Sequence, residues 1–377
     1  MEQNFDEIRP YTDAEIPAAA QRVADSPYLP AIVNYLFPGR EVGEFQQIFR
    51  NLHSIHDFQD IVMYPAIRSI IEKTSSGFST SGFESLHDNR KRMFISNHRD
   101  ILLDAAILQT LLVDHGLDTS EITFGSNLMN GELVVDIGKM NKMFRIMRGG
   151  HIRDFYQNSM HVSSYMRYAI VGKQQSVWIA QRNGRTKDGD DRTDMAVLKM
   201  FALSSDKDFV DNLSELNITP MVVSYEYEPC DFMKTQEIFI SRYQKYEKEP
   251  GEDLNSILHG IKQFKGHIHF AIAPAITVED LNFCDRFERN KKFQHLAGII
   301  DKRVYLNYKL WPTNYIAYEL LNQTYKYKDQ YTQEEMDHFV EYMEQGLSSL
   351  VGDPSELREI FLGIYANPVV NYEQLFV

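Results

Sequence analysis

The sequence has few of the residues that stabilise a small secreted fold or anchor a chain in a bilayer. Its 377 residues include two cysteines, Cys230 and Cys284, too few for a disulfide framework or a zinc site made of thiolates. We expect both to be reduced packing residues of a cytoplasmic protein. The longest charge-free apolar stretches, 105–113 and 266–278, are shorter than the roughly 18 residues that a spanning helix requires. Residues 1–11 lack the basic and apolar regions of a signal peptide, so neither a spanning segment nor a cleaved leader is expected.

Basic residues are also in the minority, with 39 Lys and Arg against 53 Asp and Glu and a net charge of −14. This acidity argues against a nonspecific nucleic-acid binder, which needs a basic footprint. Residues 139–199 have the opposite balance, because they contain twelve Lys and Arg but five Asp. Such a basic segment in an acidic chain indicates a bound anion, although a chance fluctuation of surface charge would give the same count.

The composition allows a sizeable core, since 43% of the residues are hydrophobic and the length fits one large or two modest domains. Residues 1–85 have apolar side chains at helix-like spacing, for example Phe45, Ile48 and Phe49. The Gly/Ser/Thr stretch 74–81 predicts a loop that ends this helical N-terminal segment.

From about residue 90, short β-rich runs alternate with longer helical ones, which is typical of an α/β domain with a largely parallel, buried sheet. Strands are expected at 92–98, 121–126, 175–181, 218–227 and 267–274. Helices are expected between them at 101–115, 139–148, 154–171, 191–204 and 252–263. We therefore predict an α/β fold, a mostly parallel sheet flanked by helices over 86–290, between helical segments at 1–85 and 291–377.

A polar cluster follows the first of these strands and opens an apolar helix. Ligands and catalytic groups collect at the carboxyl ends of parallel strands. His98, with Asp100 and Asp104 behind it, has the residue types of an imidazole base oriented by a carboxylate. The alternative is an ordinary helix start, in which Asn97 and Asp100 are caps and His98 is on the surface.

Four segments in order resemble one family. The run 96–104 is followed by 143–155, an apolar stretch with basic residues and Gly, by 180–189, which reads A-Q-R-N-G-R-T-K-D-G, and by 218–227, a strand with an early Pro. Residues 264–276 supply a closing Gly-then-strand element. Together these segments resemble the glycerolipid acyltransferases, the glycerol-3-phosphate and 1-acylglycerol-3-phosphate acyltransferases, over about residues 90–280.

The match is incomplete at two positions. Asn97 and His98 fit the family's first block, N-H-x-x-x-x-D, but Asp104 lies one residue beyond the family acid. In the third block, F-P-E-G-T-R-S-R-D-G, Arg185 falls on a family Arg, whereas Arg182 stands where the family has Glu. A non-catalytic relative that binds lipids or acyl chains, or an acyl thioesterase in which water replaces the acceptor, is the alternative.

The resemblance implies an O-acyltransferase of phospholipid biosynthesis that moves a fatty acyl group to a hydroxyl of a glycerol-phosphate-type or other polar lipid acceptor. The donor would be acyl-CoA or acyl-carrier protein, with no other cofactor and no metal. The protein would be cytoplasmic and contact the membrane peripherally. His98 would be the general base, with Asp104 as its partner and Asp100 as the competing choice.

The resemblance and the basic segment also suggest residues that bind the substrate. Guanidinium groups bind phosphate with several donors, which favours Arg over Lys in such a pocket. For Arg153, an ion pair with the neighbouring Asp154 is an equally good interpretation. The substrate-binding candidates are Asn97, Arg148, Arg153, Arg182 and Arg185.

Overall fold

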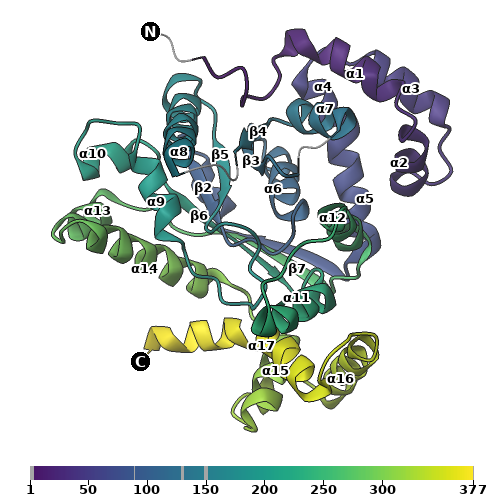
Figure 1. The fold of residues 1–377 in the computed structure, drawn as a ribbon, viewed down its shortest axis with the longest axis vertical. Helices are drawn as coiled ribbons and strands as arrows, with labels where there is room; N and C mark the ends of the chain where they lie inside the picture. Colours follow the sequence, from purple (N-terminus) through teal and green to yellow (C-terminus); the bar gives the residue numbers. More distant parts are fainter. Residues whose placement is uncertain (1–3, 89, 129–130, 148–151, 377) are drawn as a thin grey trace.

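The computed structural model describes residues 4–88, 90–128, 131–147 and 152–376, and a seven-stranded sheet forms the centre of this described part (Figure 1). The strand order is β1-β7-β6-β2-β5-β3-β4, and every neighbouring pair is parallel except β6 and β7. The strands are β1 (Gly77–Ser81), β2 (Met93–Ser96), β3 (Glu121–Gly125), β4 (Met143–Ile146), β5 (Val177–Ala180), β6 (Thr219–Tyr225) and β7 (His267–Ile272). The predicted α/β class with a mostly parallel sheet is confirmed.

Helices cover both faces of the sheet, so strands β2, β3 and β6 are buried along their whole length. On one face, side chains such as Ile95 and Val222 pack against α8 (Ile152–Arg167), α9 (Met195–Ala202), α10 (Phe209–Ser214), α13 (Val278–Asp285) and α14 (Asn290–Asn307). On the other, Phe94 and Val223 pack against α5 (Tyr64–Thr74), α6 (Leu103–Asp114) and α12 (Glu252–Lys262). Successive strand residues thus contribute to two separate cores.

Helical segments lie on either side of this domain in the sequence. The N-terminal helices are α1 (Ile16–Ala24), α2 (Leu29–Leu36), α3 (Val42–Arg50) and α4 (Ile55–Phe58), and they share a core with α7 (Glu132–Met140). The C-terminal helices are α15 (Pro312–Asn322), α16 (Gln333–Leu347) and α17 (Pro354–Glu373); α17 packs on α15 and on α11 (Asp231–Tyr243). The three-part division of the chain stays a prediction. In the described part, no helix is both long and apolar enough to cross a membrane.

Two sequence-based expectations are wrong. The predicted loop at 74–81 contains β1, which pairs with β7 at the sheet edge and places Phe78 against Phe270. The predicted helix at 139–148 is instead the end of α7 followed by β4, because Lys142 has a positive φ of 58° that ends the helix and the next four residues pair with β3. Both errors concern strands near the sheet edge, where pairing with a distant strand decides the structure.

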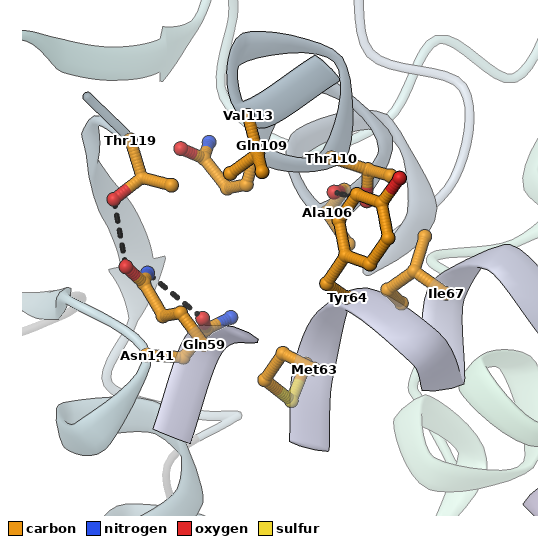
Figure 2. Close-up of a pocket in the computed structure, with 10 residues that line it drawn as sticks. All are labelled: Gln59, Met63, Tyr64, Ile67, Ala106, Gln109, Thr110, Val113, Thr119 and Asn141. Atoms are coloured by element: carbon orange, nitrogen blue, oxygen red, sulfur yellow. Dashed lines mark hydrogen bonds between the residues drawn. The ribbon is translucent and has the colours of Figure 1, made fainter. Parts of the chain in front are cut away.

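A polar contact joins the N-terminal helices to the sheet domain (Figure 2). Gln59, in the π-helical turn Gln59–Met63, accepts a hydrogen bond from Thr119 Oγ1 at 2.7 Å and donates one to Asn141 Oδ1 at 3.2 Å. The cavity beside it has a volume of about 20 Å³. That is room for about one water molecule and not for a substrate.

Candidate active site

The candidate site begins at the carboxyl end of β2, where residues 97–102 lead into α6. His98 Nδ1 lies 2.9 Å from Asp104 Oδ2, and the ring packs edge-on against Trp178. Asp104 is fully buried, whereas the His98 side chain is 13% exposed and lines a cavity. The second ring nitrogen, Nε2, has no hydrogen bond in the described part of the chain. It is therefore available to a ligand.

Asp104 is held rigidly in place from several directions. Its Oδ2 accepts the backbone N–H groups of Arg99 at 2.6 Å and Asp100 at 2.9 Å, and its Oδ1 accepts the hydroxyl of Tyr225 at 2.9 Å. Burial, and then the charge of Asp104, raise the pKa of Tyr225 well above its ordinary value, so Tyr225 stays protonated and donates. Together these contacts orient a carboxylate on one nitrogen of His98, which is the arrangement that a general base needs.

Asp100 has a different place. Its Oδ1 accepts the backbone N–H groups of Leu102 at 2.9 Å and Leu103 at 2.8 Å, so it caps the start of α6. In the described part of the chain its side chain has no hydrogen bond to His98, and a side chain added at Gly260 of α12 would collide with its carboxylate. Of the two candidate acids, Asp104 is the one in contact with His98.

Asn97 lies beneath the site. It is fully buried, donates to the Val223 carbonyl at 2.9 Å, accepts from the Val223 N–H at 2.8 Å, and donates to Asp191 Oδ2 at 3.1 Å. These bonds join the end of β2 to β6 and to the segment after β5. The structure thus places Asn97 where it orders the strand ends, and it is not among the residues that line the cavity.

A buried charge network, which sequence reasoning missed, attaches the loop 182–191 to the His98 segment. Arg99 pairs with Asp191 and, at 3.2 Å, with Glu228, while Lys234 pairs with Glu228 and donates to the Arg99 carbonyl at 2.8 Å. Burial opposes the charge on Arg99, but Asp191 and Glu228 raise its pKa well above the usual value. Buried ion pairs add little net stability, so such a network is better understood as specifying one arrangement.

The same loop is fixed from two further directions. The Thr186 N–H donates to the His98 carbonyl at 2.7 Å. Gly189 has a positive φ of 79°, and a Cβ there would lie 2.0 Å from the Ile364 carbonyl oxygen of α17. Asn367 of α17 also donates to the Asp188 carbonyl at 2.6 Å. The C-terminal helix therefore packs directly against the candidate site.

A cavity of about 460 Å³ opens beside His98. Four Lys and Arg side chains line it, three from the loop 182–191 and one from the segment before α12. Three of the four already have an ion pair or a hydrogen bond within the protein. Lys187 pairs with Glu237, Lys248 pairs with Asp253, and Arg182 donates to the Asp190 carbonyl at 3.2 Å. The fourth, Arg185, has a buried Nη1 without a hydrogen-bond partner in the described part. Because buried donors are normally satisfied, this nitrogen distinguishes Arg185 from the other three cations that line the cavity.

The remaining candidates lie at the limit of what the structure describes. Arg148 lies outside the described residues. Arg153 lies in the first turn of α8, but its side chain is outside the described part, so its ion pair with Asp154 stays a prediction. Within the described ranges, no group of three or more His, Cys, Asp or Glu has a geometry that could hold a metal ion.

Comparisons with known proteins give distant likenesses among solved structures. No family model and no curated protein matches the sequence. Among solved structures, the chain is similar to the crystal structure of the 1-acyl-sn-glycerophosphate acyltransferase PlsC from Thermotoga maritima, with 12% identity and a TM-score of 0.36 over 77% of this chain and 91% of that chain.

Proposed function

We propose that this protein transfers a fatty acyl group from a thioester donor, acyl-CoA or acyl-carrier protein, to a hydroxyl of a lipid acceptor that carries phosphate or another anionic group. The observation that carries the proposal is the His98–Asp104 pair on the wall of a cavity that Arg185 also lines, and Arg185 has a buried nitrogen without a hydrogen bond in the described part of the chain. A base and an anion-binding cation at one cavity are what transfer to a phosphorylated alcohol requires.

The chemistry follows from the orientation of His98. Asp104 favours the tautomer with the proton on Nδ1, which leaves the Nε2 lone pair for the acceptor hydroxyl. Nε2 takes the hydroxyl proton while the oxygen attacks the thioester carbonyl. The C–O bond forms, the C–S bond breaks, and the imidazolium returns the proton to the departing thiolate. Asp104 stabilises the imidazolium between these steps.

One assay tests the proposal directly. Purified protein is incubated with a labelled acyl thioester and a panel of acceptors, and products are analysed by mass spectrometry. Acylated acceptor supports the proposal. Free fatty acid released at the same rate with and without acceptor would identify a thioesterase, and a bound but unreacted acyl chain would identify a binding protein.

Arg185→Ala is expected to raise the acceptor KM about ten- to hundredfold and to change kcat much less. A hydrogen bond to a charged group is worth about 1.5–3 kcal/mol, and Arg185 would bind the acceptor anion equally in the ground and transition states. Steady-state kinetics with varied acceptor measures this split.

Lys187→Ala is the matched control for Arg185, because Lys187 lines the same cavity but is neutralised by Glu237. It should change the acceptor KM less than about threefold. Arg182→Ala tests whether a second guanidinium contributes to binding of the acceptor anion. An unchanged KM in Arg182→Ala would remove Arg182 from the site, and an unchanged KM in Arg185→Ala would refute anion binding there.

Tyr225→Phe is expected to lower kcat about tenfold and to leave the acceptor KM within about twofold. The substitution removes the hydroxyl that holds Asp104 Oδ1 and leaves a buried carboxylate oxygen without that donor. Tyr165→Phe is the control, since Tyr165 donates to Glu121 at 2.7 Å in the other core and does not touch His98. Equal kcat losses in the two variants would mean that Tyr225 acts only through stability.

Peripheral membrane contact and a cytoplasmic location are part of the proposal, because a lipid acceptor must be reached from the bilayer surface.

A further inference from the structure

A second, shallow cavity of about 630 Å³ lies on α13 and α14, and none of its lining residues belongs to the cavity of His98. Figure 1 shows these two helices at one side of the molecule, away from α11 and α12, which contribute to the candidate active site. We call this surface the α13–α14 groove. Its lining residues are Phe283, Phe287, Lys291, Gln294, His295, Gly298, Ile299 and Lys302.

The floor of the α13–α14 groove is aromatic and exposed. Phe287 stacks on His295 with ring centroids 3.7 Å apart, and Phe283 meets both rings edge-on. Phe283 is 42% exposed, and Val278 and Leu306 at the far ends of the two helices are each 49% exposed. A cluster of large apolar side chains on the surface, rather than a single one, indicates an interaction site.

Cations border this apolar floor. Lys291, His295, Gly298 and Lys302 follow each other at intervals of four, three and four residues, which places them on one face of α14. Lys291 and Lys302 are exposed and have no ion pair in the described part of the chain. Over both helices, residues 278–303 contain six Lys and Arg and five Asp and Glu, in a chain whose net charge is −14. Lys292 and Arg303 are paired with Asp285 and Asp280 of α13, so Lys291 and Lys302 are the lysines that remain for an anionic partner.

We infer that the α13–α14 groove docks on the surface of an anionic lipid bilayer, with the Phe side chains entering the headgroup region and the lysines facing the lipid charges. Exposed aromatic residues within a basic border have the chemistry of a peripheral membrane contact. The inference rests on the membrane contact proposed above and assigns it to a surface separate from the site of acyl transfer.

Gly298 allows a test that does not put the fold at risk. A Cβ at Gly298 meets no atom within 4 Å, and both Glu and Lys have a higher helix propensity than Gly. Gly298→Glu should weaken binding to vesicles of phosphatidylglycerol and phosphatidylcholine at least fivefold in a co-sedimentation assay without substrates. Gly298→Lys, at the same position, should bind as tightly as the wild type or several-fold more tightly, since each added basic residue near an anionic surface favours binding.

Gly43→Glu is the matched control for the added charge, because Gly43 lies on the exposed side of α3 and its Cβ also meets nothing within 4 Å. It should bind like the wild type. Phe283→Ser should weaken binding about tenfold through loss of apolar contact, whereas Tyr325→Ser, at an 84% exposed side chain, should not.

Three results would overturn the inference. The first is a Gly298→Glu variant that binds as the wild type does. The second is an equal loss of vesicle binding in Gly298→Glu and Gly298→Lys, which would mean that a second copy of the chain or another protein fills the groove. The third is wild-type protein that binds vesicles of pure phosphatidylcholine as tightly as vesicles that contain phosphatidylglycerol. Acyl transfer to a dispersed short-chain acceptor separates the two proposals, because it tests the His98 site and should be unchanged in Gly298→Glu.

Discussion

His98→Ala should lower kcat for acyl transfer by about 10²–10⁴-fold, the range expected when a positioned general base is removed. Alanine has no group to take the acceptor proton, and Asp104 is too far inside the protein to replace the imidazole, since it is fully buried. The fold should survive, because His98 is partly exposed at a strand-to-helix connection and its main hydrogen bond is the one to Asp104. Single-turnover rates with bound donor and acceptor measure the chemical step.

His269→Ala controls for the loss of a histidine. His269 is half-buried in β7, next to the edge strand β1, and bonds to Ser79 and Ser81, away from the candidate site. Its replacement should therefore leave kcat unchanged. Circular dichroism of both variants must match that of the wild type. Residual activity of His98→Ala within about tenfold of the wild type would rule out the general-base role.

Asp104→Asn should also lower kcat, by up to about 10⁴-fold, which is the size of the loss when the buried acid of a serine-protease triad is replaced by its amide. The amide oxygen can still accept from the Arg99 and Asp100 N–H groups, so the loop retains much of its support. What is lost is the negative charge beside the imidazolium. The pH profile of kcat, together with thermal unfolding, separates this electrostatic loss from instability.

Asp100→Asn is the internal control, because it makes the same chemical change four residues earlier. Asn is as good a helix cap as Asp, so the bonds to Leu102 and Leu103 should persist and kcat should change little. If Asp100→Asn abolishes turnover while Asp104→Asn does not, the assignment of the partner acid is wrong.

Much of the fold could be predicted from local patterns. The five predicted strands from 92–98 to 267–274 correspond to β2, β3, β5, β6 and β7, because buried parallel strands are short apolar runs bounded by polar residues. The local sequence does not predict β1 and β4, because their few residues are strands only through pairing with β7 and β3. The Gly/Ser/Thr composition of β1 is typical of a loop, and the residues of β4 follow closely on those of a helix. Neither local pattern indicates the strand with which the segment pairs.

For the candidate site, local patterns predicted that His98 follows a strand and that two acids lie close behind it in the sequence. Which acid contacts His98 depends on the fold, because the path of residues 97–102 brings Asp104 to Nδ1 and makes Asp100 a helix cap. The fold also determines that, among the described residues, Arg185 keeps a buried nitrogen without a hydrogen bond, since the bonds of Arg182 and Lys187 depend on how the loop 182–191 folds and on Glu237. The contacts of Tyr225 with Asp104 and of Arg99 with Glu228 join residues more than 100 positions apart, and no spacing in the sequence encodes such pairs. Periodicity records which side chains are buried, whereas a site is made of the particular side chains that folding places in contact.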